Sequence, residues 1–276
     1  MNIQEIVEIL VRSGIEPNEA SKEVKMLIEH FCNYTAKDII LGTPLDYEKL
    51  EIVKQKAQLR ANTRKPIQYI IGQSYFMGDF YEVNEDVLIP RDETEIVVNH
   101  ALKIIKNNGF KKVLDIGTGS GCIACAISKY AKVDVCAVDI SDSALKIAKK
   151  NAKKLGVGVN FINSDLFSNI NEKFDLIISN PPYIPKGTKV QRELGYEPQN
   201  ALFTSEETGC EFYKKIIEDG VDKFLNKNGY IVFEVGISQS ELVKQYFENN
   251  GFVDIVIEND LANIPRAISA KKSYNK

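Results

Sequence analysis

The sequence is poor in histidine, the side chain that most often carries general acid–base chemistry. It contains only two among 276 residues, His30 and His100, and both lie in segments with helical periodicity. Histidine catalysis and histidine metal sites usually need several such residues brought together with carboxylates or cysteines. We therefore expect neither in this chain.

Cysteine is present, but its pattern lacks the partners of a zinc or disulfide framework. The five cysteines are an odd number, and only Cys122 and Cys125 have the C-x-x-C spacing. A structural zinc site would need a second pair, which the sequence does not contain. The alternatives for Cys122 and Cys125 are a redox pair and core packing. Their apolar context, GCIACAIS, favours packing as small hydrophobic side chains, and we expect no metal.

The sequence also lacks a long apolar run, a secretory signal pattern and an excess of basic charge. Lys and Arg number 35 against 38 Asp and Glu, which gives a net charge of −3. These absences argue against a membrane or secreted protein, and weaken the case for a protein that binds nucleic acid directly. We expect a cytoplasmic protein.

The chain is predicted to fold as three parts. Residues 1–73 show the periodicity of several amphipathic helices and form a small helical domain. A substrate-docking module and a purely structural cap are both consistent with this segment, and we expect docking. In residues 66–90, aromatic and β-branched residues alternate with polar ones, which predicts one or two β-hairpins, with a linker at 74–90. Residues 91–276 form the main domain. Its first helix has a predicted capping box of Asp92 and Glu95.

Strands and helices alternate through the main domain from Lys111 onward. This order is typical of a doubly wound, mostly parallel α/β sheet. The predicted strands lie at 111–116, 133–140, 160–167, 173–179, 230–236, 252–260 and 265–273. An irregular stretch at 185–208 interrupts the alternation, and loops of this length are usually functional or mobile.

A glycine-rich turn follows the first of these strands. It consists of Gly117, Thr118, Gly119, Ser120 and Gly121. Such a turn lets a ligand approach the backbone at a helix N-terminus. Asp139 ends the next strand, 22 residues after Gly117, a spacing that suits a carboxylate bound to ribose hydroxyls. A cap at the end of the strand is the alternative for Asp139. Asp115 can organise the turn and face an ammonium group. Together they predict a site for S-adenosylmethionine.

The stretch Asn180, Pro181, Pro182 and Tyr183 ends the buried strand FDLIIS. Ligands bind beyond the carboxyl ends of strands in open α/β sheets. The two prolines stop the strand and stiffen the backbone, so that Asn180 presents a donor and an acceptor beside an aromatic ring. This arrangement suits the binding of a planar amide or amine. A strand-ending turn with an incidental asparagine is the alternative for such a stretch taken alone.

These motifs, with LIPRDETE (Leu88–Glu95) and EPQNAL (Glu197–Leu202), resemble those of the HemK/PrmC-type protein-(glutamine-N5) methyltransferases, which modify peptide chain release factors. The resemblance covers nearly the whole chain. It implies a class I S-adenosylmethionine-dependent methyltransferase, with a Rossmann-like seven-stranded sheet, a helical N-terminal bundle and a hairpin connector. The substrate would be the glutamine of the Gly-Gly-Gln motif, presented to a monomeric enzyme.

The resemblance also implies roles for individual residues. Residues 117–121, Asp139 and Asn180 would bind the cofactor, and residues 180–183 the glutamine amide, with Asn180, Pro181 and Tyr183 catalytic. Relatives can carry an aromatic residue after the acid of the third strand, packed on adenine. Here Leu166 follows Asp165, so either Leu166 or Phe167 would cover the ring.

Two other functions remain open at the level of sequence. The Asn-Pro-Pro-Tyr motif also occurs in methyltransferases that act on exocyclic amines of nucleic acids, for which a basic groove would be expected. A scaffold that binds the cofactor without turnover is the second alternative, although a scaffold has no need of an intact Asn180 motif.

Overall fold

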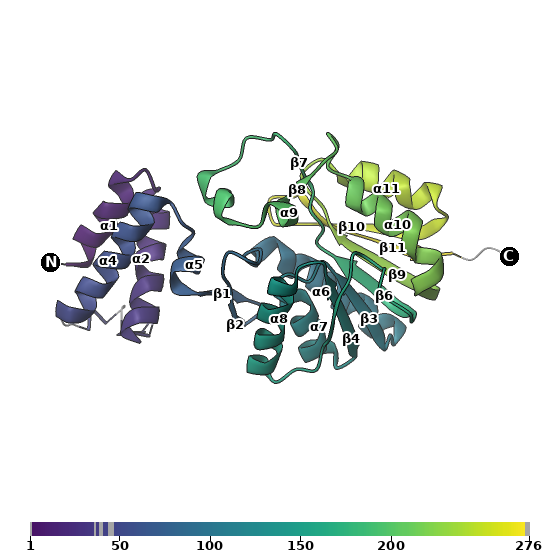
Figure 1. Cartoon of the computed structure of the whole chain (residues 1–276), viewed down its shortest axis with the longest axis horizontal. Coiled ribbons are helices and arrows are strands. Elements are labelled where there is room, and N and C mark those ends of the chain that lie inside the picture. The colour runs from purple at the N-terminus through teal and green to yellow at the C-terminus, as the bar shows by residue number, and fades with distance from the viewer. Residues whose placement is uncertain (1, 36, 39–40, 44–46, 274–276) are drawn as a thin grey trace. The chain divides into compact units, whose positions relative to one another are not determined.

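The computed structural model describes residues 2–35, 37–38, 41–43 and 47–273, and it contains two compact units (Figure 1). The first unit comprises Met1–Gln73 together with Gln191–Tyr196. The second comprises Ser74–Val190 and Glu197–Lys276. In the described part of the chain, no helix combines the length and apolar character needed to cross a membrane.

The first unit is a small helical bundle. Its helices are α1 (Ile3–Arg12), α2 (Pro17–Cys32), α4 (Tyr47–Thr63) and α5 (Ile67–Ile71). Asn2 caps α1 by accepting a hydrogen bond from the Glu5 amide at 2.9 Å. The apolar faces of α1, α2 and α4 meet in one core around Leu10, Leu27 and Val53. The hairpin predicted from residue 66 is wrong over α5, because Ile67–Ile71 packs into this core as a helical turn.

A segment distant in sequence completes the first unit. The 3₁₀ helix η1 (Arg192–Tyr196) brings Glu193 to within 3.0 Å of Arg60 and 2.6 Å of Arg64. Arg60 is buried and also pairs with Glu23 at 2.9 Å. Each buried charge therefore has an opposite partner, which offsets the cost of removing it from water.

The second unit is built on a seven-stranded sheet in the order β10-β11-β9-β6-β3-β4-β5. The strands are β3 (Lys112–Ile116), β4 (Asp134–Asp139), β5 (Asn160–Asn163), β6 (Phe174–Ser179), β9 (Leu225–Glu234), β10 (Phe252–Asn259) and β11 (Pro265–Lys272). Strands β5, β4, β3, β6 and β9 are parallel, and β11 and β10 close the sheet in antiparallel pairs. The predicted Rossmann-like, mostly parallel sheet is confirmed.

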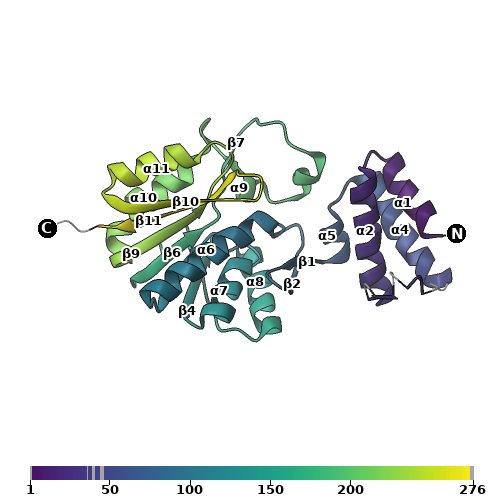
Figure 2. The ribbon, with the colours of Figure 1, turned by 180° about the vertical axis from the view of Figure 1, so that it is seen from behind.

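Helices cover both faces of this sheet (Figure 2). They are α6 (Asp92–Asn108), α7 (Cys122–Ala131), α8 (Asp142–Leu155), α10 (Glu211–Phe224) and α11 (Ser240–Asn249). Successive residues of a strand point to opposite faces. Accordingly, Val113 packs with α6 and α7, whereas Leu114 packs with α10 and α11. Cys122 and Cys125 lie in the core on the α7 face, and burial raises the pKa of the Cys122 thiol to about 12.

Smaller elements flank the sheet. A hairpin is formed by β1 (Gln73–Phe76) and β2 (Asp79–Glu82). A second pair is formed by β7 (Ile184–Pro185) and β8 (Phe203–Thr204), and the short helix α9 (Gln199–Leu202) directly precedes β8. The predicted capping box is wrong. Asp92 is the first residue of α6, Arg91 is the N-cap without a side-chain bond, and the Glu95 carboxylate accepts from the Met77 amide at 2.6 Å. Glu95 thus fastens the hairpin turn instead of the helix end.

We predict that Gly220→Ala destabilises the second unit by about 1–3 kcal/mol, the range for overpacking a well-filled core. A Cβ atom at Gly220 would lie 1.9 Å from Cε2 of Phe167, whose ring stacks on Phe224 with centroids 4.9 Å apart. Chemical denaturation measures the change. The control is Gly158→Ala, where a Cβ meets no atom within 4 Å, so that a shift within about 0.5 kcal/mol is expected. Equal effects of the two variants would contradict the packing argument.

Candidate active site

The parallel register of four strands aligns the predicted site residues at one edge of the sheet. Ile116 of β3 lies opposite Val138 of β4 and Ser179 of β6. Ser179 in turn lies opposite Phe233 of β9. Moving one residue toward the carboxyl ends gives a single row: Gly117, Asp139, Asn180 and Glu234. Two segments that the sequence places far apart are therefore neighbours because of strand pairing alone.

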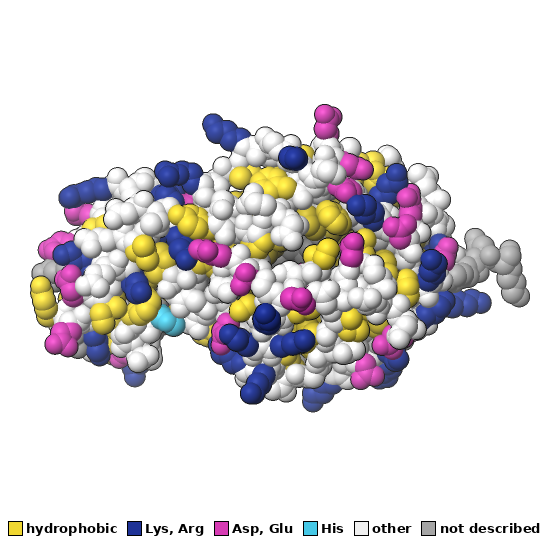
Figure 3. Space-filling view, viewed as in Figure 1, with side chains coloured by type: hydrophobic (Ala, Val, Ile, Leu, Met, Phe, Trp, Pro, Cys, Tyr) yellow, Lys and Arg dark blue, Asp and Glu magenta, His cyan; other side chains and the backbone are white. Residues whose placement is uncertain are grey.

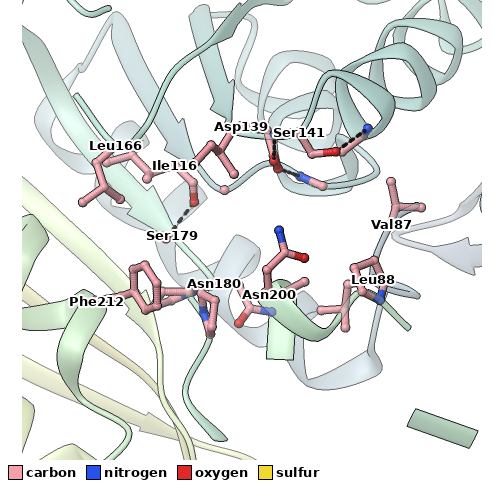
Figure 4. Close-up of a pocket in the computed structure, with 18 of the residues that line it drawn as sticks. Val87, Leu88, Ile116, Asp139, Ser141, Leu166, Ser179, Asn180, Asn200 and Phe212 are labelled. Atoms are coloured by element: carbon pink, nitrogen blue, oxygen red, sulfur yellow. Dashed lines mark hydrogen bonds between the residues drawn. The ribbon is translucent and has the colours of Figure 1, made fainter. Parts of the chain in front are cut away.

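A cavity of about 550 Å³ opens at this edge, entirely within the second unit. This volume is within the usual range for sites that bind small molecules and cofactors. Figure 4 shows Asp139 and Ser141 on one side of the cavity, with Asn180 and Phe212 on the opposite side. Other parts of the wall come from Leu166, from residues 85–88, and from Pro198, Asn200 and Ala201.

Two glycines of the turn after β3 line the cavity, Gly117 and Gly119. Their φ angles are +73° and +54°, a left-handed conformation that favours glycine. The Asp139 carboxylate holds the turn, because one oxygen accepts from the Gly119 amide at 2.8 Å and the other from the Ser141 amide at 2.9 Å. Burial raises the pKa of Asp139. A carboxylate offers about four lone-pair sites, so Asp139 retains capacity to bind hydroxyls in the cavity.

The other three residues of the turn do not line the cavity. The Thr118 hydroxyl donates to Asp115 at 2.6 Å, Ser120 is buried, and a Cβ at Gly121 would lie 3.0 Å from Cβ of Ala148 on α8. Asp115 is itself fully buried behind the turn, and burial raises its pKa to about 7. These side chains shape the turn from within, and a glycine at 121 permits close packing of α8.

The structure places three residues of the Asn-Pro-Pro-Tyr motif on the cavity and one beside it. Asn180, Pro181 and Pro182 line the cavity. Tyr183 is partly buried against the core, and a Cβ atom at Gly236 would lie 2.9 Å from its Cδ2 atom. Burial raises the pKa of the Tyr183 hydroxyl, so it stays protonated at neutral pH.

The pocket wall after β5 carries Leu166 and not Phe167. Leu166 lines the cavity with φ +49°, and its carbonyl accepts from the Ser164 hydroxyl at 2.9 Å. Phe167 is buried in the core, stacked on Phe224. Of the two side chains considered for an adenine ring, only Leu166 therefore faces the cavity. Asp165 lines it as well.

A buried carboxylate that sequence reasoning did not single out joins the two family-specific motifs. Glu197 accepts from the Ile89 amide at 3.0 Å and pairs with Arg91. It thereby fixes the segment that carries Leu88 next to the one that carries Asn200, and both of these line the cavity. The motifs themselves were visible in the sequence, but their mutual contact was not. Phe212 and Ile216 of α10 were also missed, since their helical spacing is that of ordinary core residues.

Comparison with known proteins identifies the family. The model of the family described as "Methyltransferase small domain" matches residues 92–204. The chain is 35% identical over 253 residues to the release factor glutamine methyltransferase of Flavobacterium psychrophilum, covering 88% of each chain. It is 39% identical over 228 residues to the protein of that name from Fusobacterium nucleatum subsp. nucleatum, covering 80% of this chain and 64% of the relative. The chain belongs to the release factor glutamine methyltransferase family.

A solved structure supports the fold. The ribosomal protein L11 methylase of Lactobacillus delbrueckii subsp. bulgaricus superimposes with a TM-score of 0.53 at 21% identity, covering 73% of this chain and 90% of the methylase. At this identity the likeness shows the fold alone. The seven-stranded sheet of this chain is the one that the resemblance to the family implied.

The residues present fit S-adenosylmethionine as the methyl donor. Open backbone at Gly117 and Gly119, where an added Cβ would meet no atom within 4 Å, gives room for a ligand against the turn. Asp139 offers carboxylate lone pairs for ribose hydroxyls, and Leu166 offers an apolar surface for adenine. The cofactor side of the cavity would thus be formed by β3, β4 and the segment after β5.

We predict that Asp139→Asn weakens binding of S-adenosylmethionine at least about 10-fold, which is about 1.4 kcal/mol. In the wild type the two carboxylate oxygens accept from the backbone N–H groups of Gly119 and Ser141. An asparagine has only one oxygen, so its NH₂ group would face one of these two N–H donors, and that N–H would lose its acceptor. Calorimetric titration with the cofactor measures the affinity. Asp142→Asn is the matched control, because Asp142 does not line the cavity. Unchanged affinity in Asp139→Asn would remove the ribose-binding role.

Proposed function

We propose that this protein transfers a methyl group from S-adenosylmethionine to the side-chain amide nitrogen of the glutamine in the Gly-Gly-Gln motif of peptide chain release factors. The observation that carries the proposal is the position of Asn180. It ends β6 on the cavity, followed by two prolines that also line it, and faces the Asp139 side across the cavity. The names of the relatives support the substrate.

The chemistry asks the protein for orientation more than for a base. The bound cofactor supplies a methyl group that its sulfonium already activates. An amide nitrogen is a weak nucleophile, because its lone pair is delocalised into the carbonyl. The Asn180 side-chain oxygen and the Pro181 carbonyl are the acceptors that we assign to the two N–H groups of the substrate amide. Two fixed acceptors orient the nitrogen and stabilise the positive charge that develops on it. As the nitrogen–carbon bond forms, the bond from the methyl carbon to sulfur breaks, and the methylated amide then releases one N–H proton to water.

The remaining assignments follow from the same site. Gly117 and Gly119 of the turn bind the cofactor together with Asp139, Leu166 and Asn180, and residues 180–183 bind the glutamine. The expected cofactor contacts of Thr118, Ser120 and Gly121 are replaced by a role in shaping the turn, because these residues do not line the cavity. For Tyr183, contact with the substrate amide stays a prediction, since its ring packs beside the cavity and against Gly236. Asn180, Pro181 and Tyr183 are the catalytic residues in this proposal.

The partner in this proposal is a protein and not a nucleic acid. Basic and acidic side chains are both spread over the face that Figure 3 shows, in keeping with a net charge of −3. A domain at 1–73 docks the release factor, a linker at 74–90 follows, and residues 91–276 carry the chemistry. The protein acts as a monomer in the cytoplasm, where translation termination takes place.

We predict that Asn180→Ala lowers kcat for methylation of a release factor roughly 100-fold, the usual cost of losing one preorganised hydrogen-bonding group at a reacting centre. Cofactor affinity should change by no more than about 3-fold, because Asp139 and the glycine turn remain. Steady-state transfer of a labelled methyl group at saturating cofactor and release factor gives kcat. Asn259→Ala, at the end of β10, is the control. Near wild-type kcat in Asn180→Ala, with the cofactor bound, would contradict the role of Asn180 in orienting the substrate amide.

The substrate is tested separately. Wild-type protein with labelled cofactor is offered a release factor or duplex DNA, and mass spectrometry reads the products. We expect the mass of one methyl group on the glutamine of the Gly-Gly-Gln motif and no label on DNA. Label on the DNA would favour an exocyclic-amine methyltransferase, and binding of cofactor without turnover on either would favour a scaffold.

A further inference from the structure

Two buried side chains behind Asn180 form a polar chain that leads to its amide. Glu234 is the neighbour of Asn180 in the row at the sheet edge, on β9. Thr94 comes from the first turn of α6, 140 residues earlier than Glu234. Both are about 2% exposed, and neither lines the cavity. No step of the proposed reaction uses them, so their burial as polar groups needs another explanation.

The distances define the direction of each hydrogen bond. The Thr94 hydroxyl lies 2.6 Å from Oε2 of Glu234 and donates to it. The Asn180 side-chain nitrogen lies 3.5 Å from the same hydroxyl oxygen, at the long end of a hydrogen bond. A hydroxyl has one proton, and Thr94 gives it to the carboxylate. Toward Asn180 it therefore presents lone pairs, which attract an NH₂ group and repel an amide oxygen.

We infer that Thr94 and Glu234 are positioning residues that hold the Asn180 amide with its nitrogen inward and its oxygen toward the glutamine amide. The inference rests on the proposed function for its substrate. The two ends of an asparagine amide are alike in size and opposite in hydrogen bonding. Without a fixed neighbour Asn180 could present its NH₂ group to the NH₂ of the substrate, which would leave the transferring nitrogen without an acceptor.

Both Thr94 and Glu234 are held in place by the surrounding core. Thr94 is in the first turn of α6, whose core residues Val97 and Val98 are fully buried. The backbone carbonyl of Glu234 accepts from the Tyr213 hydroxyl of α10 at 3.0 Å. Buried hydrogen bonds between secondary-structure elements resist reorientation, because any alternative leaves a buried polar group without a partner.

The ionisation of Glu234 supplies a second line of support. Burial raises its pKa to about 7, while the Thr94 hydrogen bond opposes that shift. An ionised carboxylate only accepts hydrogen bonds. A protonated one can donate to Thr94, whose own proton is then free to turn toward Asn180 and favour the inverted amide. The charged or titratable groups that face Glu234 are Glu93, Arg91, Arg266, Tyr183, Tyr213 and Cys122.

We predict that Thr94→Val lowers kcat at least about 10-fold with cofactor affinity within about 2-fold, since only the orientation of a reacting-site group is lost. Thr94→Ser, which keeps the hydroxyl, should recover most of the loss. In an Asn180→Ala background, Thr94→Val should cost less than about 2-fold, because residues that act through one group are not additive. Steady-state methylation of a release factor at saturating substrates gives all of these rates.

Three results would overturn the inference. They are a Thr94→Val variant with kcat within 2-fold of wild type, a Thr94→Ser variant as slow as Thr94→Val, and an equal cost of Thr94→Val with and without Asn180. Denaturation of each variant shows that it is folded. Wild-type protein that fails to methylate any release factor would instead overturn the proposed function.

The contact between Thr94 and Asn180 can also be tested without a substrate, so that the test holds even if the protein methylates no release factor. The side-chain NH₂ group of Asn180 is followed by NMR in asparagine-labelled protein and assigned by its absence in Asn180→Ala. Its resonance should shift in Thr94→Val and return close to the wild-type position in Thr94→Ser. An unchanged resonance in Thr94→Val would refute the contact with Thr94 whatever the enzyme methylates.

The pH profile tests the carboxylate. If the ionised form of Glu234 orients Asn180, kcat rises with pH through about 7 in the wild type, and Glu234→Gln, which cannot ionise, gives a flatter profile with its remaining activity. Asp115, which titrates in the same range, is common to both proteins. The same rising limb in Glu234→Gln would assign it to another group and contradict the role of Glu234.

Stability separates this role from a purely structural one. The folded-state pKa of Glu234 is raised. Its favourable contribution to the free energy of unfolding is therefore complete below pH 4.5 and is lost as pH rises through about 7. At pH 8 Glu234→Gln should therefore be at least as stable as the wild type while its pH profile differs. A large loss of stability at pH 8 would mean that Glu234 serves mainly to hold the fold.

Discussion

The register of the parallel strands is the constraint on which the site depends. Strands β4, β3, β6 and β9 pair so that each contributes one residue to a single row at their carboxyl ends. The register is held by the cores on the two faces of the sheet, where Val113 and Leu114 face opposite ways. A slip of one residue would exchange these faces, so the packing that stabilises the sheet also fixes the separation of Asp139 and Asn180.

Around that row, carboxylates with hydrogen-bond partners hold backbone and side chains in place. Asp139 fastens the glycine turn through two backbone N–H groups, and Glu197 fastens the segment at Ile89 and Arg91. Glu234 does the same for the Thr94 hydroxyl. Such groups would be costly if unpaired, and pairing makes each of them a rigid support. The cavity is thus organised before a ligand enters, which is the condition for electrostatic catalysis without reorganisation.

Local signals in the sequence were enough to predict the framework. The glycine turn, Asp139 and the Asn180 motif each follow a recognisable strand, and topology alone brings the ends of parallel strands together. What could not be predicted depends on contacts between distant segments. Glu95 has the spacing of a capping box but binds Met77, and Ile67–Ile71 alternates as a strand would but packs as a helix. The choice of Leu166 over Phe167 was decided by Phe224 and Gly220, 57 and 53 residues further along.

The proposed reaction needs no strong base before methyl transfer, but it does need an oriented asparagine. With two histidines in the chain, both outside the cavity lining, the site offers acceptors to a neutral amide nitrogen. A carboxylate would accept from either oxygen and need no orientation, but an asparagine accepts at one end only. Its neutral amide avoids placing another charge beside buried Glu234, whose pKa is already raised by burial. The use of asparagine at this position therefore demands a polar neighbour that distinguishes its two ends, and Thr94 is placed to be that neighbour.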